Sequence, residues 1–144
     1  MLGAVFYYAH MIDLTIICAS NDLSLEQSSA TEQSKQHQHT LLDYLCTHAN
    51  ASVQYRASDM MLKVHSDRSY LSVRGGRSRA AGYFYFGKNI HMKQNEQSQG
   101  SMHQECSIIK PVVASTAECE TATLFLNCRT TIVLRIAAKE MGHP

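Results

Sequence analysis

The chain has 144 residues, the length of one ordinary domain, and its composition is 44% hydrophobic and 17% charged. These values are typical of a globular protein and exclude a disordered or low-complexity chain. Thirteen Lys and Arg residues against 12 Asp and Glu residues give a net charge of +1. The whole chain therefore has neither a basic excess that would indicate nucleic-acid binding nor an acidic tail.

The charge is nevertheless unevenly distributed along the sequence. Residues 1–55 carry five acids and one base, a net of −4, whereas residues 56–110 carry nine bases and four acids, a net of +5. Residues 68–93 contain six Arg and Lys residues and no acid. Such a segment either presents a basic face to a polyanion or forms a solvated hairpin tip. Two tyrosines within it, Tyr83 and Tyr85, can stack on bases, but their apolar surroundings favour packing in the core.

The cysteines and the N-terminal segment indicate the compartment. Five cysteines are widely spaced and form no Cys-x-x-Cys motif, which predicts reduced thiols rather than a zinc site. Residues 1–18 are apolar, but His10 and Asp13 interrupt them and no basic segment precedes them, which argues against a signal peptide or a membrane span. We therefore expect an intracellular protein, cytoplasmic or nuclear, without a membrane partner.

The first third of the sequence predicts helices. Residues 2–12 and 13–27 predict two short helices, with Asp13 as the N-cap of the second. Residues 29–32 match a capping box that ends in Glu, and apolar residues recur at helical spacing beyond it. A third helix is therefore predicted at about 30–48.

The middle of the chain changes to patterns typical of strands. Residues 52–55 predict a short strand, and residues 60–66 alternate between apolar and polar side chains. Residues 80–86 end in four consecutive aromatic side chains, which is typical of a strand buried on both faces. Residues 105–109 predict the third main strand.

Short connections and one long helix complete the pattern. Gly75 and Gly76 predict a turn, and the polar residues 88–103 predict a loop, so the main strands should form an antiparallel meander. Residues 115–118 match a second capping box and precede a helix at about 116–140, which should pack across one face of the sheet. The apolar side chains on one stripe of this helix are Phe125, Cys128, Ile132 and Ile136.

Two acidic residues stand out by their context. Asp67 lies at the end of the alternating strand, and Glu120 lies in the first turns of the last helix. If that helix packs on the sheet, the two carboxylates can face each other and hold divalent metal ions, which activate water in phosphodiester cleavage. Both residues also have structural explanations, because Glu120 suits a helix N-terminus and Asp67 can end a strand or pair with Arg68 or Arg77.

Short segments spread over nearly the whole chain carry a family resemblance. They include HSDRSYLS at 65–72, RSRAAG at 77–82 and ASTAECE at 114–120. The others are residues 2–9, 41–45, 55–60, 105–108 and 141–144. In their order and spacing, these segments resemble the pol polyprotein of copia-type retrotransposons, from the end of the reverse transcriptase into the RNase H domain.

The resemblance implies an incomplete RNase H-like α/β fold. A helical connection segment, residues 1–51, would precede a truncated RNase H-like domain, residues 52–144. That domain would hold a mixed or antiparallel sheet of three to four strands with one long helix packed on it. The resemblance also implies that Asp67 and Glu120 are catalytic and bind Mg²⁺ or Mn²⁺, with an RNA·DNA hybrid as the substrate. The basic residues implied to lie near the nucleic-acid backbone are Arg74, Arg77 and Arg79.

The sequence departs from the family pattern in two respects. Two further catalytic aspartates of the family lie beyond the last helix, and this sequence ends before them. Arg68 follows Asp67 where the family has a small residue, and its cation competes with a metal ion for negative charge. We therefore expect a catalytically incomplete fragment of a retrotransposon polyprotein, whose partners are nucleic acid and the rest of that polyprotein. The alternatives are a non-catalytic nucleic-acid-binding module and a degenerate retroelement remnant without activity.

Overall fold

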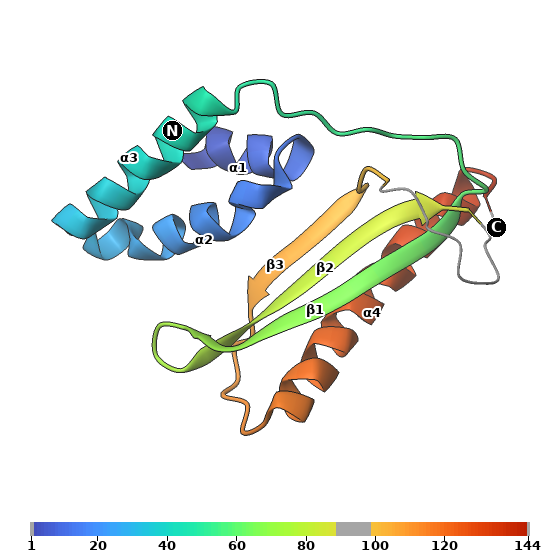
Figure 1. Ribbon diagram of the computed structural model, residues 1–144. Helices are drawn as coiled ribbons and strands as arrows, with labels where there is room; N and C mark the ends of the chain where they lie inside the picture. The colour runs from blue at the N-terminus through green and yellow to red at the C-terminus, as the bar shows by residue number, and fades with distance from the viewer. Residues whose placement is uncertain (1, 89–98, 144) are drawn as a thin grey trace. The chain divides into compact units, whose positions relative to one another are not determined.

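The computed structural model describes residues 2–88 and 99–143. The chain divides into two compact units, which we call unit 1 (residues 1–53) and unit 2 (residues 54–144). Unit 1 is helical, and unit 2 holds a sheet and one long helix (Figure 1). None of the five cysteines takes part in a disulfide bond.

Unit 1 consists of three α-helices and two short 3₁₀ turns. Asp13 caps the first 3₁₀ turn, as its carboxylate accepts a hydrogen bond from the Thr15 backbone N–H at 3.1 Å. The capping box predicted at residues 29–32 is wrong, because Thr31 caps the third helix and exchanges hydrogen bonds with Ser34 rather than with a glutamate. The elements are α1 (Leu2–Met11), η1 (Leu14–Ile16), α2 (Ile17–Glu26), η2 (Gln27–Ser29) and α3 (Glu32–Thr47).

Unit 2 is a mixed α/β arrangement built on a three-stranded antiparallel sheet. The strands β1 (Met61–Val73), β2 (Arg77–Gly87) and β3 (His103–Ile108) lie in the order β1-β2-β3, which confirms the predicted meander. The predicted strand at 52–55 is absent, so the sheet has three strands among the described residues. Most of the predicted loop at 88–103 lies outside the described residues.

The segment that precedes β1 is held by isolated hydrogen bonds instead of a ladder. The Gly100 N–H donates to the Gln54 carbonyl oxygen at 2.8 Å, and the Tyr55 hydroxyl donates to the Ser101 carbonyl oxygen at 2.9 Å. These contacts tie residues 54–55 to the segment just before β3 without making them a strand.

The β1–β2 hairpin turns at two glycines and contains an irregularity in β1. Gly75 and Gly76 have φ values of +80° and +67°, a left-handed conformation that favours glycine, and the predicted turn is confirmed. Between Ser69 and Val73, β1 contains more residues than the facing part of β2. Leu71 within this bulge also has a positive φ, and its N–H donates to Ser78 Oγ at 3.0 Å.

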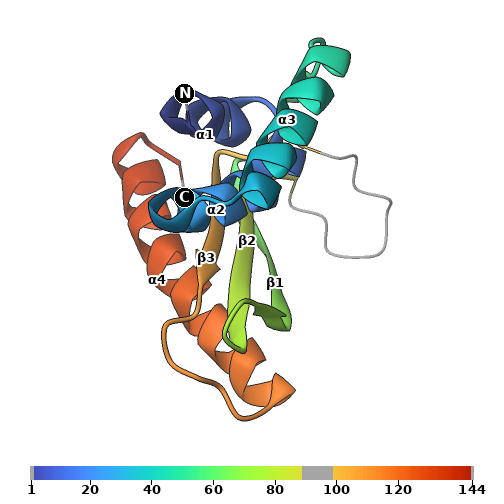
Figure 2. The same cartoon turned by 90° about the vertical axis from the view of Figure 1, so that its left-hand side faces the viewer.

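The long helix α4 (Thr116–Glu140) packs against one face of the sheet, over β1 and β2, as Figures 1 and 2 show. A small apolar core joins the helix, the sheet and the connection before the helix. Its fully or nearly buried members are Ala80, Ile109, Val113 and Cys119. The next helix turns bury polar side chains instead, because Thr123 and Asn127 are only 1% and 2% exposed.

Asn127 links α4 directly to the two strands beneath it. Its Nδ2 donates to Ser66 Oγ at 2.7 Å and to the Ala81 carbonyl oxygen at 2.9 Å. Gly82 makes this approach possible, since a Cβ at that position would lie 2.9 Å from Asn127 Cγ. The side of α4 that meets the sheet is therefore partly polar, while the apolar stripe predicted from Phe125 to Ile136 is exposed.

Candidate functional site

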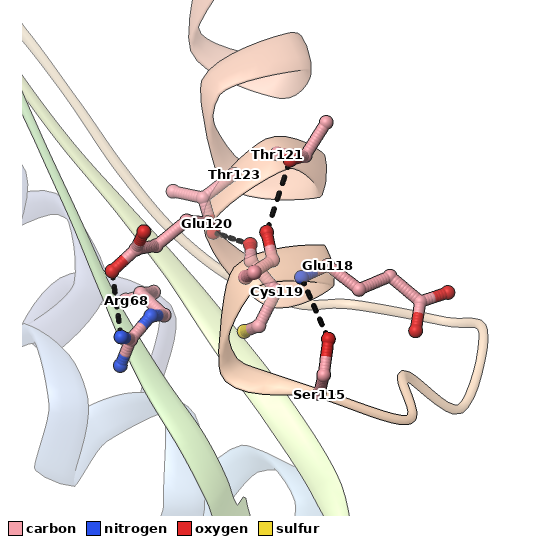
Figure 3. A network of polar contacts seen from close by, with 8 residues as sticks. Arg68, Ser115, Glu118, Cys119, Glu120, Thr121 and Thr123 are labelled. Carbon is pink, nitrogen blue, oxygen red and sulfur yellow. Dashed lines mark hydrogen bonds and ion pairs between the residues drawn. The ribbon is translucent and has the colours of Figure 1, made fainter.

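The first turn of α4 positions Glu120. Ser115 is the N-cap, and its Oγ accepts a hydrogen bond from the Glu118 N–H at 3.1 Å. The Glu118 carboxylate accepts one from the Ala114 N–H at 2.6 Å. Figure 3 shows Glu118 and Glu120 pointing to different sides of the helix, with Glu120 directed toward β1. The prediction that the start of the last helix lies near the first main strand is confirmed.

Arg68 on β1 forms an ion pair with the carboxylate of Glu120. Arg68 Nη2 lies 2.7 Å from Glu120 Oε1, which makes a charge-assisted hydrogen bond (Figure 3). The side chain of Arg68 is 23% exposed and that of Glu120 is 63% exposed. Because Glu120 is largely solvated, the pair contributes on the order of 0–1 kcal/mol to stability. Its chemical consequence is that a cation of the chain itself lies beside the acid predicted to bind metal.

Asp67 lies on the other side of β1. The side chains of Ser66 and Arg68 both contact α4, and successive side chains of a strand point to opposite faces. Asp67, between them, therefore belongs to the sheet face away from α4, which we call the far face. It is exposed and pairs in register with Ala81 of β2. The structure brings Glu120 to β1 but does not bring Asp67 and Glu120 together, so the expectation that they face each other is wrong.

The described residues do not fit the predicted Mg²⁺ or Mn²⁺ site. Such ions take several oxygen ligands, and a two-metal site needs enough carboxylates to balance the charge of both ions. Within residues 2–88 and 99–143, no group of three or more His, Cys, Asp or Glu side chains could hold a metal ion. Of the two predicted ligands, Glu120 is paired with Arg68 and Asp67 lies across the strand. No hydrolytic step follows from this arrangement.

The three predicted basic residues gather at the hairpin end of the sheet. Arg74 lies in the β1–β2 turn, Arg77 begins β2, and Arg79 pairs in register with Ser69. Residues 77 and 79 alternate in step with Ala81, the partner of Asp67, so both belong to the far face. Arg74 and Arg77 are exposed, and Arg79 is half-buried.

Aromatic side chains continue the far face along β1 and β2. The ring of exposed His65 stacks on that of Tyr85 with centroids 5.3 Å apart, and His65 Nε2 lies 3.0 Å from Tyr85 Oη. The Tyr83 ring lies 5.6 Å from the Tyr85 ring, and its hydroxyl donates to the Gln99 carbonyl oxygen. Burial raises the pKa of the Tyr83 phenol above its ordinary value. Tyr85 is only 6% exposed, so the prediction that this tyrosine packs inside the molecule is confirmed.

Sequence reasoning missed the contact made by Arg68 and the position of His65 on the far face. The available signal was the period of two, since a strand that directs Ser66 to a helix directs Arg68 there as well. The sequence did not show which set of alternating residues faces the helix, because both sets are polar around Asp67.

An apolar cavity of about 440 Å³ lies in unit 1. It is bounded by α2 and α3, with Ile16, Leu23 and Leu41 among its lining side chains. None of the predicted site residues lines it.

Comparison of the chain with protein-family models, with curated proteins and with solved structures finds no match. In the described part of the chain, none of the helices combines the length and the apolar character needed to cross a bilayer. A function for this chain therefore has to follow from its own side chains.

Proposed function

We propose that unit 2 is a non-hydrolytic nucleic-acid-binding module, and that the chain is a fragment of a retrotransposon polyprotein related to RNase H. The observation that carries the first part is the ion pair between Arg68 and Glu120, 2.7 Å long, with Asp67 on the opposite side of β1. A divalent cation would have to displace the Arg68 guanidinium from Glu120, and it would find no second carboxylate on that side of β1 because Asp67 lies on the other side. The second part rests on the sequence resemblance alone.

The far face supplies the charge for binding. Among the strand residues whose side chains belong to the far face, three are basic and one is acidic. The basic residues are Lys63, Arg77 and Arg79, and the acidic residue is Asp67. Arg74 adds a further positive charge at the adjoining turn. The acid on β3, Glu105, belongs to the α4 face, where it accepts a hydrogen bond from Thr130 at 2.9 Å. The far face is therefore net positive, although the whole chain is nearly neutral.

The arrangement of these groups favours contacts with a phosphate backbone. Arg77 and Arg79 are two residues apart on one strand, and their guanidinium groups suit phosphate oxygens. His65, which is exposed and held by its stack on Tyr85, offers a ring to an unpaired base further along the same face. We infer that an RNA·DNA hybrid or another nucleic acid binds by charge, with little sequence preference.

Fluorescence anisotropy with a labelled RNA·DNA hybrid at low salt tests the proposal in the full chain. We expect binding that weakens as salt rises and that EDTA leaves unchanged, because the contacts release counterions and need no metal. Arg77→Glu combined with Arg79→Glu should weaken binding about tenfold or more. A duplex DNA and a single strand of the same sequence measure the preference between nucleic acids.

The matched control is Arg129→Glu combined with Lys139→Glu, which reverses two exposed charges of α4. Because α4 lies on the opposite face of the sheet, this variant should bind within about threefold of the unmodified chain. Equal loss in both double variants would mean that only the net charge matters and would contradict a far-face site. Absence of binding at low salt would also contradict it, and would favour the remnant without activity.

A further inference from the structure

The outer side of α4 carries an exposed seam with the spacing of a coiled coil. The residues farthest from the sheet recur at alternating intervals of three and four, and all are exposed. Phe125 and Ile132, the apolar members at its centre, are 63% and 60% exposed. This outer seam consists of Glu118, Thr121, Phe125, Cys128, Ile132 and Arg135.

Two further apolar side chains flank the outer seam. Leu124 on one side and Ile136 on the other are 56% and 55% exposed. The sheet cannot cover any of these residues, because it binds the opposite side of α4 through Cys119, Thr123 and Asn127. Large exposed apolar side chains at adjacent positions on one helix mark an interaction surface rather than ordinary scatter.

The charges at the ends of the outer seam are complementary to those of a second copy of the chain in antiparallel orientation. Glu118 lies at the N-terminal end and Arg135 at the C-terminal end, 17 residues or about 26 Å apart on a helix. If two α4 helices run antiparallel, each Glu118 meets the Arg135 of the other copy. Between them, Phe125 meets Cys128 and Ile132 meets Thr121, both from the other copy. A parallel pair would instead place like charges together at both ends.

We propose that α4 forms an antiparallel two-helix interface between two copies of this chain, independently of nucleic-acid binding. The interface is small, a single helix from each copy, and its seam includes polar residues. Its affinity should therefore be modest, with a dissociation constant in the micromolar range on the order of 10⁻⁶–10⁻⁵ M. The pairing leaves the far face free, because α4 lies on the other side of the sheet.

Sedimentation velocity of the full chain over a range of concentrations tests the interface. We expect a monomer–dimer equilibrium that Ile132→Asp shifts toward monomer by at least about tenfold in dissociation constant. Val133→Asp is the matched control, because Val133 is at least as exposed as Ile132, at 66% against 60%, but lies outside the outer seam. Far-UV circular dichroism of each variant shows whether the fold is retained.

A charge exchange tests the orientation. Arg135→Glu alone should weaken the dimer, and adding Glu118→Arg should restore it at least in part, because the two end pairs re-form with reversed signs. Glu118→Arg alone measures the cost of losing the contact between Glu118 and the Ala114 N–H. A monomer at every concentration would overturn the proposal, including the case in which another part of the same chain covers the seam. Equal effects of Ile132→Asp and Val133→Asp, or no restoration by the charge exchange, would overturn it as well.

Discussion

Arg68 is the residue on which the chemistry of unit 2 depends. It reaches the Glu120 carboxylate because it shares the α4 face of β1 with Ser66, while Asp67 is directed to the far face. The sequence drew attention to Arg68 as a departure from the family pattern, but not to its partner. An ion pair across 52 positions of sequence follows from the packing of α4 and not from any local pattern.

Removing Arg68 should not create a metal site. In Arg68→Ala, Glu120 is free of its partner, but Asp67 still lies on the opposite side of the strand. We expect Mn²⁺ at millimolar concentration to leave the melting temperature of Arg68→Ala unchanged, as in the unmodified chain, because no binding means no stabilisation by linkage. If Mn²⁺ raises the melting temperature of Arg68→Ala, and this rise disappears when Asp67→Asn is added, the two acids do converge.

Asn127 makes the polar contact that fixes α4 on the sheet. Asn127→Ala removes the donor to Ser66 Oγ and to the Ala81 carbonyl oxygen, and should lower the free energy of unfolding by about 1–3 kcal/mol. Gly82→Ala should cost a similar amount, because its Cβ would approach Asn127 Cγ to 2.9 Å.

Urea titrations of the two single variants and of the double variant measure these effects. Since both changes act on one contact, the double variant should lose less than the sum of the single losses. Full additivity would mean that the two residues act independently. Arg129→Ala on the exposed side of α4 serves as the control and should change stability by less than about 0.5 kcal/mol.

Ionisation of Tyr83 should lower the free energy of unfolding of unit 2 at alkaline pH. Burial raises the pKa of its phenol, so above about pH 10 the unfolded chain gives up the proton before the folded chain does. The contribution of the protonated Tyr83 to the free energy of unfolding is complete below that pH, and it is lost as the pH rises through the pKa of Tyr83 in the folded chain. Thermal melts between pH 8 and pH 11 should therefore show a shallower decline for Tyr83→Phe, and parallel declines would contradict this.

At the scale of elements, α4 shows most clearly what the sequence determines. The start of the helix was predictable because Ser115 and Glu118 act locally at its N-terminus. Its end was predictable because Gly142 follows the last turn. The orientation of the helix about its axis was not predictable. The most apolar stripe lies outside, since the sheet offers Ser66 Oγ and the Ala81 carbonyl oxygen to an amide side chain, and only the assembled fold brings these groups together.

The N-cap of α4 should contribute measurably to the stability of unit 2. Ser115→Ala leaves the Glu118 N–H without its acceptor and should cost about 1 kcal/mol, whereas Ser115→Asp keeps an acceptor and should be nearly neutral. Thermal unfolding of the two variants checks this. Equal melting temperatures would contradict a capping role for Ser115.

At the scale of the whole molecule, the three strands and four α-helices of the described residues follow from local patterns in the sequence. The meander was predicted from three local patterns: the alternation at 60–66, the aromatic run before Gly87, and the turn at Gly75 and Gly76. The predicted strand at 52–55 failed, since one backbone hydrogen bond from Gly100 to Gln54 does not make a ladder. The candidate site could not be predicted, because the sequence does not show which face of the sheet α4 covers. That choice decides whether Asp67 or its neighbours Ser66 and Arg68 lie beside the helix.

A single assay of a labelled RNA·DNA hybrid with the full chain and Mg²⁺ most directly tests binding without hydrolysis. Anisotropy reports binding, and a denaturing gel of the same sample reports the length of the RNA strand. We predict that the hybrid is bound and that its RNA strand stays intact over hours. Cleavage of the RNA strand that Asp67→Asn abolishes would contradict the account, because it would require Asp67 to act at a metal centre.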